Sequence, residues 1–251
     1  MSCGQVVIKA PRLTAPIKKV KPVLLDLDLM RPHEEIIGKR LSDVKEFILS
    51  IKAIDSPLIV APIPGTKLYL IVDGHHRWAA LRELKCTKAP SIIVDYFDEG
   101  IKLYTWYPAF KGKLEDFLKA LDRRGIKYSV CNRRLSEFIL ANNAAFVLLN
   151  GEGLCIEISG GIAVEKAVSR VLDELSLIGS IKLYYYGLLE HALEDLASGE
   201  VSYVLIRKKL TKEEVMSVVI RGEVLAPKTT RHVLPFTPEE TYTPLSLCCA
   251  Q

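Results

Sequence analysis

Apolar residues in the first part of the chain change repeatedly from short continuous runs to helical spacing. Residues 23–54 begin as an apolar strand and continue as a helix, whose apolar face carries Leu41, Val44, Phe47, Ile48 and Ile51. Residues 57–64 and 68–74 are short apolar runs bounded by Pro, Gly and Thr, which predicts two strands joined by a turn. Residues 75–85 have helical spacing, and residues 90–98 and 101–108 return to strand character.

The same alternation continues after residue 110. We expect helices over residues 113–125, 133–143, 163–179, 188–199 and 211–220, and strands over 126–131, 144–150, 154–159, 181–187 and 201–209. This mixture indicates an α/β (α+β mixed) protein. The break at "YPAFKGK" suggests an N-terminal domain over 1–110 and a second α/β domain over 111–251. Residues 222–247 contain four of the thirteen prolines, so we expect an extended C-terminal segment on the surface.

Composition and charge narrow the class of protein. With 251 residues, 49% of them hydrophobic and 25% charged, the chain is typical of a globular protein with a large core. The net charge of +4 suits anionic ligands but falls short of the basic surface of a nucleic-acid-binding domain. No stretch reaches the roughly 18 apolar residues of a spanning helix. We therefore expect a cytoplasmic protein with neither a nucleic acid nor a membrane as its partner.

Six cysteines are scattered along the chain without a CxxC pair, which argues against a zinc site. In a reducing compartment most of them are expected to be buried thiols. The chain contains only two Gln and four Asn, a scarcity that suits a heat-adapted organism, in which intracellular disulfides also occur.

The stretch "VDGHHRW" joins the end of a predicted strand to the start of a predicted helix. Gly74 allows a tight turn, and an anion at the first helical turn gains about 0.3–1 kcal/mol from the unpaired N–H groups and the helix dipole. His75, His76 and Arg77 add donors there, which favours a phosphate site. A structural explanation is also open, in which Asp73 caps the helix and the histidines are exposed polar residues. Shared metal binding by His75 and His76 is disfavoured, because adjacent helical residues point about 100° apart.

A second group of polar donors lies in the proline-rich tail. The run "PKTTRH" places a lysine, two threonines, an arginine and a histidine in succession, and these donors suit phosphate oxygens. An exposed basic loop would explain the charges, but it explains the two consecutive threonines less readily.

Two of these segments resemble a known superfamily. "LDLMRPHEEIIGKRLSDVKEFILSIK" followed by "IVDGHHRWAALRELK" is similar to the leading motifs of ParB and sulfiredoxin proteins, over about the first 110 residues. Sulfiredoxins carry a reactive cysteine where this chain has His75, and ParB proteins continue into a helix-turn-helix region where this chain continues as α/β. Archaeal free serine kinases resemble the chain best, since "RPHEE", "DGHHRW", "TWYP" and "PKTTRH" are all similar to theirs.

This resemblance implies transfer of a phosphoryl group from ADP or ATP, with Mg²⁺, to the hydroxyl of free L-serine. Such a transfer needs a carboxylate near the hydroxyl, cationic donors on the phosphates and usually a bridging metal. Glu34 is the expected base, with adjacent Glu35 as the alternative, and Asp73 is the expected magnesium ligand. The remaining expected site residues are His75, His76 and Arg77 at the transferred phosphate and serine, Thr105 and Trp106 at the serine pocket, and Gly74, Lys228, Thr229, Thr230, Arg231 and His232 at the nucleotide.

Two other functions remain open from the sequence. The chain could be a ParB-like nucleotide-binding protein, hydrolysing CTP and associated with DNA, or a nucleotide sensor without catalysis. Neither the choice between ADP and ATP nor the oligomeric state follows from the sequence.

Overall fold

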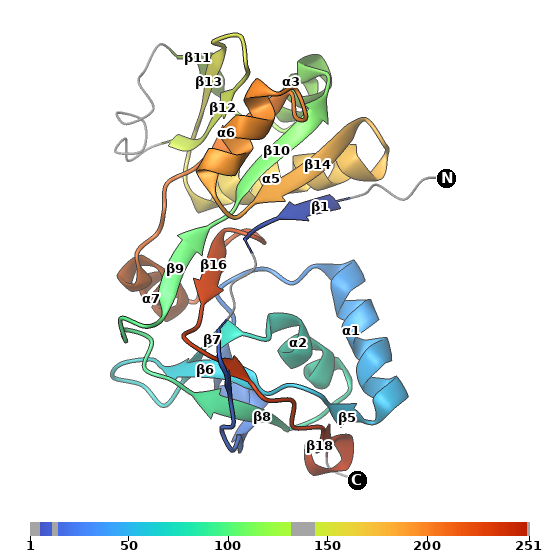
Figure 1. Cartoon of the computed structure of the whole chain (residues 1–251), viewed down its shortest axis with the longest axis vertical. Coiled ribbons are helices and arrows are strands. Elements are labelled where there is room, and N and C mark those ends of the chain that lie inside the picture. The colour runs from blue at the N-terminus through green and yellow to red at the C-terminus, as the bar shows by residue number, and fades with distance from the viewer. Residues whose placement is uncertain (1–5, 12–14, 132–143, 250–251) are drawn as a thin grey trace. The chain divides into compact units, whose positions relative to one another are not determined.

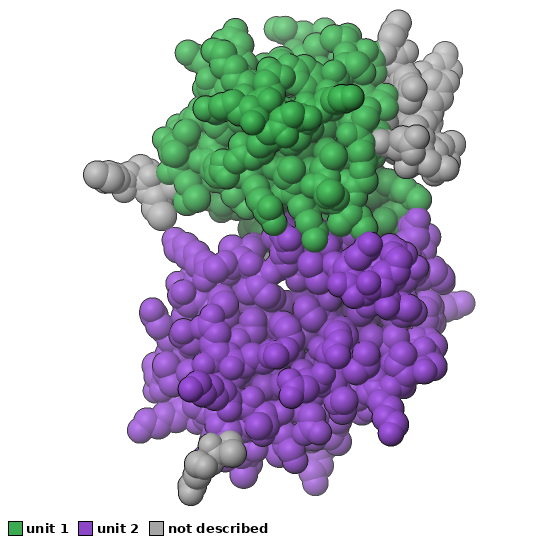
Figure 2. Space-filling model, turned by 180° about the vertical axis from the view of Figure 1, so that it is seen from behind, with its two compact units in different colours: residues 1–12, 104–210, 228–231 green, residues 13–103, 211–227, 232–251 purple. Residues whose placement is uncertain are grey.

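The computed structural model describes residues 6–11, 15–131 and 144–249 and divides the chain into two compact units (Figure 1). Unit 1 comprises residues 1–12, 104–210 and 228–231, and unit 2 comprises residues 13–103, 211–227 and 232–251 (Figure 2). Neither unit is one continuous stretch, and the C-terminal tail contributes to both. The mixed α/β fold class predicted from the sequence is confirmed.

Unit 2 is built on a five-stranded sheet in the order β3-β8-β6-β7-β4. The strands are β3 (Val23–Asp26), β4 (Met30–Arg31), β6 (Leu58–Pro62), β7 (Tyr69–Asp73) and β8 (Lys88–Ile93). The β6–β8 and β7–β4 pairs are parallel, whereas β3–β8 and β6–β7 are antiparallel. Because β6 and β7 are almost entirely apolar and buried, they form the centre of this sheet.

Two main helices and several short elements complete unit 2. Helix α1 (Gly38–Ile51) contacts α2 (His75–Glu83), and the 3-10 helix η1 (Leu27–Leu29) precedes β4. Helix α7 (Lys212–Ile220) precedes the tail, and the tail adds the 3-10 helix η2 (Leu245–Leu247). It also pairs β17 (Thr237–Pro238) with β2 (Ile17–Lys18) and β18 (Thr243–Pro244) with β5 (Ala53–Ile54). These pairings fix the tail to the fold as short extended segments.

Unit 1 contains a seven-stranded sheet in the order β1-β14-β10-β15-β12-β13-β11. The strands are β1 (Val6–Lys9), β10 (Tyr107–Gly112), β11 (Tyr128–Val130), β12 (Ala144–Leu149), β13 (Cys155–Ser159), β14 (Ile181–Tyr186) and β15 (Tyr203–Ile206). Only the β1–β14 pair is parallel among the described strands of this sheet. A further two-stranded sheet pairs β9 (Lys102–Thr105) with β16 (Thr230–Val233).

Both faces of the unit 1 sheet are buried, because successive strand residues face opposite sides. Phe110 packs in the apolar cluster with α3 (Leu114–Asp122) and α5 (Ile162–Leu177), whereas Ala109 packs in the cluster with α6 (Leu189–Ala197). In β14, Tyr185 belongs to the first cluster and Tyr184 to the second. The sheet therefore lies between α3 and α5 on one face and α6 on the other (Figure 1).

The structure corrects several details predicted from the sequence. The tail is not simply a surface segment, since Leu225, Ala226 and Thr229 are all buried. In α1, Ile48 is buried as predicted but Phe47 is 48% exposed, so the apolar face is narrower than its spacing indicated. The helix predicted over 133–143 lies outside the described residues.

The cysteines also differ from the expectation of buried thiols. Cys86 is bonded to Cys249 and Cys131 to Cys155, while Cys248 is a buried free thiol. None of the helices among the described residues combines the length and the apolar character that crossing a lipid bilayer requires.

Candidate active site

The segment that carries Glu34 is held by the backbone of a distant part of unit 2. Leu225 N–H donates to the His33 carbonyl over 2.8 Å, and Glu35 N–H donates to the Leu225 carbonyl over 3.0 Å. Glu34 and Leu225 thereby form an isolated parallel β-bridge. His33 is almost completely buried, whereas Glu34 and Glu35 are half-buried. The backbone on both sides of Glu34 is therefore fixed, while its side chain keeps access to solvent.

The turn from β7 to α2 has the predicted position but a different cap. Gly74, not Asp73, is the N-cap residue, and its φ of 97° lies in the left-handed region that favours glycine. A Cβ at this position would lie 3.1 Å from the Leu58 Cγ, which adds a steric reason for glycine. Asp73 instead accepts a hydrogen bond from Arg77 over 2.8 Å, and Arg77 also donates to the Ser56 carbonyl over 2.9 Å. The Asp73 carboxylate is thus positioned by Arg77 and 63% exposed.

His75 and His76 both contact the segment that carries Glu34. His75 Nε2 lies 3.3 Å from the His33 backbone nitrogen and 3.0 Å from His33 Nδ1. His76 Nε2 lies 3.2 Å from the backbone nitrogen of Ile37. Since a backbone N–H can only donate, each Nε2 atom acts as an acceptor, which requires unprotonated Nε2. Burial and then the neighbouring His33 hold the pKa of His75 well below its usual range, which keeps this imidazole neutral.

Two further residues, His232 and Tyr96, extend this histidine cluster. His232 Nε2 lies 2.8 Å from the Tyr96 hydroxyl, and the His232 and His33 rings pack edge to face at 5.0 Å. Burial holds the pKa of His232 well below its usual range and raises the pKa of Tyr96. The sequence reasoning missed His33 and Tyr96, although the "RPHEE" motif itself contains His33. The cluster therefore combines the buried His33 and Tyr96 rings with the half-buried, neutral rings of His75 and His232, next to the half-buried Glu34.

In unit 1, the predicted tail residues lie beside the predicted aromatic residue. Lys228 Nζ lies 5.2 Å and Arg231 Cζ 5.5 Å from the centroid of the Trp106 ring, distances typical of cation–π contacts. The buried Thr105 hydroxyl donates to the Thr229 carbonyl over 2.6 Å and ties the two segments together. The structure therefore brings together residues separated by more than 120 positions in the sequence.

Two tyrosines that the sequence reasoning missed complete this group. Lys228 Nζ lies 5.3 Å from the Tyr185 ring, and Arg231 Cζ lies 5.9 Å from the Tyr104 ring. Lys228 has a φ of 56°, a left-handed conformation that is uncommon outside glycine and is found disproportionately at functional sites. Burial lowers the pKa of Arg231 from its usual value, yet a guanidinium remains charged at neutral pH. Two cations among three aromatic rings provide partners for phosphate oxygens and for a stacked ring.

The predicted site residues are divided between the two units. Glu34, Asp73, Gly74, His75, His76, Arg77 and His232 belong to unit 2. Thr105, Trp106, Lys228, Thr229, Thr230 and Arg231 belong to unit 1, and Thr230 is buried there. Arg231 and His232 are consecutive residues of β16. Within the described ranges there is no group of three or more His, Cys, Asp or Glu side chains that could hold a metal ion by themselves.

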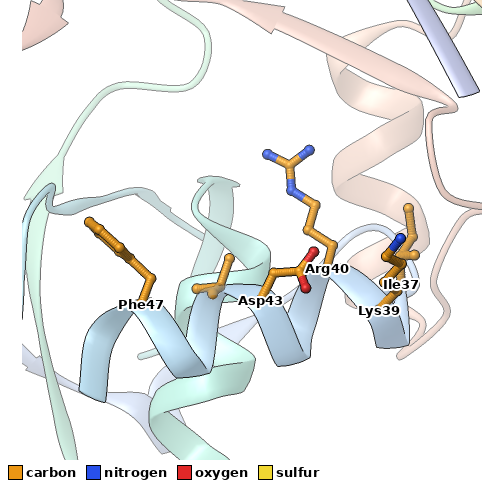
Figure 3. Close-up of a pocket in the computed structure, with 6 residues that line it drawn as sticks. Ile37, Lys39, Arg40, Asp43 and Phe47 are labelled. Atoms are coloured by element: carbon orange, nitrogen blue, oxygen red, sulfur yellow. The ribbon is translucent and has the colours of Figure 1, made fainter. Parts of the chain in front are cut away.

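A surface depression of about 500 Å³ lies along α1 (Figure 3). None of the site residues predicted from the sequence lines it. Its lining combines both charges with apolar side chains: Ile37, Lys39, Arg40, Asp43, Val44 and Phe47. The depression therefore lies along α1 and meets the predicted site residues through Ile37, whose backbone N–H is bonded to His76.

Comparison with known proteins identifies both parts of the chain. The ParB N-terminal domain family matches residues 13–104, and the family described as L-serine kinase SerK, C-terminal domain, matches residues 105–207. An ATP-dependent L-serine kinase of Desulfurococcus mucosus is 49% identical over 249 residues, which cover 97% of each chain. The chain belongs to the L-serine kinase family. The resemblance seen in the sequence motifs is thereby confirmed over nearly the full length.

Other relatives of this family differ in the nucleotide that their names give. An ADP-dependent L-serine kinase of Thermococcus kodakarensis is 47% identical over 92% of this chain and 95% of its own. The solved structure of a free serine kinase in complex with AMP has a TM-score of 0.92 and 45% identity, covering 96% of this chain and 99% of that one. A variant with a glutamate replaced by alanine, in complex with ADP, matches with the same TM-score and identity. The L-serine kinase family thus includes proteins named for either donor.

Proposed function

We propose that this protein transfers the terminal phosphoryl group of ADP or ATP to the hydroxyl of free L-serine, with Mg²⁺, and so forms O-phospho-L-serine. The near-full-length similarity to named L-serine kinases is the observation that carries this proposal. The SerK C-terminal match also distinguishes it from a ParB-like DNA-associated protein, because that match covers the part of the chain in which a ParB protein has its DNA-binding region.

Glu34 is the proposed general base. Its carboxylate accepts the proton of the serine hydroxyl, the serine oxygen forms a bond to the terminal phosphorus, and the bond from that phosphorus to the bridging oxygen breaks. AMP then leaves if the donor is ADP, and ADP leaves if the donor is ATP. The rigid backbone around Glu34, bridged to Leu225, supports this role, because a base must keep hydrogen-bond reach of one defined proton. Glu35 is the alternative base.

Asp73 is the proposed magnesium ligand. Mg²⁺ is commonly bound by one or two carboxylates together with substrate phosphates, so a single exposed carboxylate fits such a role. When bound, the ion would neutralise charge on the phosphate oxygens. Arg77 fixes the Asp73 carboxylate, and the N–H groups of the first α2 turn after Gly74 provide donors for a phosphate.

The unit 1 group is proposed to bind the substrates. Lys228 and Arg231 supply positive charge for nucleotide phosphates, and buried Thr229 and Thr230 accompany them on the same segment. Trp106, with Thr105 preceding it, is proposed to form a wall of the serine pocket. We further propose a cytoplasmic location, with serine and the nucleotide as the partners of the protein.

The test is direct detection of product. The purified protein is incubated at elevated temperature with Mg²⁺, L-serine and either ADP or ATP, and phosphoserine and the nucleotide product are quantified. We expect phosphoserine together with an equal amount of AMP or ADP, and its dependence on the donor gives the donor preference. Absence of phosphoserine with both donors, from protein shown to be folded, would exclude the proposal.

A pair of variants separates the two candidate bases. Glu34→Gln removes the proton acceptor while keeping size and hydrogen bonding, so kcat should fall by about 10²–10⁴-fold. Glu35→Gln is the matched control and should retain most of the activity. If the two results were reversed, Glu35 would be the base.

A further inference from the structure

The two adjacent histidines at the start of α2 reach two different points of the segment that carries Glu34. Neighbouring residues of a helix project about 100° apart, so His75 and His76 cannot easily serve one ligand atom. In the structure they do not: His75 Nε2 lies 3.3 Å from the backbone nitrogen of His33, and His76 Nε2 lies 3.2 Å from that of Ile37. These two amides flank the candidate bases, one residue before Glu34 and two residues after Glu35.

We propose that His75 and His76 are positioning residues, which hold residues 33–37 through their Nε2 atoms and so fix the Glu34 carboxylate for proton transfer. This proposal rests on the proposed function, in which Glu34 is the base.

The fixed backbone partners of His33, His75 and His76 determine which ring nitrogen of each carries no proton or one proton. His33 Nδ1 lies 2.8 Å from the Ile71 carbonyl, which can only accept, so His33 Nδ1 carries the proton. His75 Nε2 accepts from the His33 backbone N–H, and its 3.0 Å contact with His33 Nδ1 is only the second branch of a bifurcated bond, because the single Nδ1 proton is already donated to Ile71. His75 Nε2 must therefore be unprotonated, and the neutral ring carries its proton on Nδ1. The same reasoning gives His76 an unprotonated Nε2 facing the Ile37 N–H.

Both ends of the segment are thereby connected to rigid parts of unit 2. His33 is linked to β7 through Ile71, and the two histidines belong to the first turn of α2, directly after β7. Leu225 pairs with the segment through the His33 carbonyl and the Glu35 N–H. Hydrogen bonds from two distant parts of the sequence thus hold the segment at His33, Glu35 and Ile37.

The effect on catalysis follows from geometry. A displacement of about 1 Å at a reacting group can cost about 10²-fold in rate, even when binding is preserved. Loss of one histidine contact should therefore lower kcat, while KM for serine and for the nucleotide changes little. Loss of a histidine that mainly binds phosphate would instead raise the KM for the nucleotide.

The test compares His76→Leu with His76→Gln, because the glutamine amide oxygen can accept the Ile37 N–H near the position of Nε2. We expect His76→Leu to lower kcat by about 10-fold to 10²-fold at nearly constant KM, and His76→Gln to recover most of this loss. His191→Leu, at an exposed histidine of α6, is the matched control. The pair His75→Leu and His75→Gln repeats the comparison at the other end of the segment.

A double-mutant cycle shows whether the effect passes through Glu34. In the Glu34→Gln background, His76→Leu should cause no further loss of kcat. A loss of the same size in both backgrounds, with Glu34→Gln itself nearly inactive, would overturn the positioning role and leave the base assignment standing. Full activity of Glu34→Gln would overturn the base assignment and the positioning role together.

Amide hydrogen exchange over residues 33–37 gives a readout that does not depend on turnover. His76→Leu should accelerate exchange in this segment and His76→Gln should not, whereas exchange in β12 and β15 stays unchanged in both. Unchanged exchange in His76→Leu would show that the contact does not hold the segment. Faster exchange with unchanged kcat would show that the contact does not position the base. Either result overturns the proposal, and neither depends on serine being the substrate that accepts the phosphoryl group.

Discussion

The two disulfides among the described residues should stabilise the protein by different amounts, because they close loops of very different length. Cys86 and Cys249 are 163 residues apart in the sequence, whereas Cys131 and Cys155 are 24 residues apart. A cross-link removes conformational freedom from the unfolded chain in proportion to the logarithm of the loop length. For these separations the chain-entropy treatment gives about 5 kcal/mol for the long loop and about 3.5 kcal/mol for the short one.

Two double variants isolate the contributions. Cys86→Ala with Cys249→Ala leaves only the short loop, and Cys131→Ala with Cys155→Ala leaves only the long one. The free energy of global unfolding is measured in guanidinium chloride for each variant, with and without a phosphine reductant. Because oxidised and reduced forms of the same sequence are compared, the cost of truncating the side chains cancels.

We expect both a ranking of the two variants and a definite difference in the effect of the reductant on their free energies of unfolding. The reductant should lower the free energy of unfolding by about 1.7 kcal/mol more in the variant that keeps the long loop. Cys248→Ala is added to both variants, because burial raises the pKa of the Cys248 thiol to about 11 and slows its exchange only while the protein is folded. An equal reductant effect in the two variants, or a larger one for the short loop, would refute the loop-entropy reasoning.

Three further predictions concern single side chains of unit 1. Asp195 accepts hydrogen bonds from Lys9 and Tyr186, both over 2.6 Å, and these bonds hold the pKa of its carboxyl below the usual value. The ionised Asp195 therefore adds to the free energy of unfolding above the unfolded pKa of about 3.9, and this contribution is lost as the pH falls through the folded pKa. Asp195→Asn should therefore flatten the loss of unfolding free energy below about pH 4 in acid titrations followed by circular dichroism, and an unchanged slope would contradict this assignment. Phe117 is completely buried in α3, so Phe117→Ala should cost about 3–5 kcal/mol in chemical denaturation, and a loss below about 1 kcal/mol would contradict tight packing. Trp106→Ala should raise the KM for serine by about tenfold, as expected for the loss of an aromatic wall, with a smaller change for Trp106→Phe; an unchanged KM in steady-state assays would exclude Trp106 from the pocket.

Local interactions explain which features could be predicted from the sequence. Short apolar runs predicted β6 and β7, and helical spacing predicted α2 and α5, because a regular element buries either one face or nearly all of its side chains. Gly74 was identified at the β7 to α2 turn because a backbone at φ of 97° strongly favours glycine. The four sequence motifs were sufficient to identify the family.

The contacts of the site depend on the tertiary structure instead. The hydrogen bonds of His75 and His76 to residues 33–37 join positions about 40 apart, and Lys228 meets Trp106 across more than 120 positions. No local spacing encodes such contacts, since they arise only when the sheet sets the distance between its loops. The N-cap of α2 is an example. Asp73 is a residue type that often caps helices, yet in the structure Gly74 is the N-cap and Asp73 accepts a hydrogen bond from Arg77. The sequence by itself thus determined the described α-helices, most of the longer strands and the family, because these depend on local residue patterns, whereas β1 and the short strands of the tail form only by pairing with distant strands. The tertiary structure decided which side chains act together, because long-range packing alone brings their atoms within hydrogen-bonding distance.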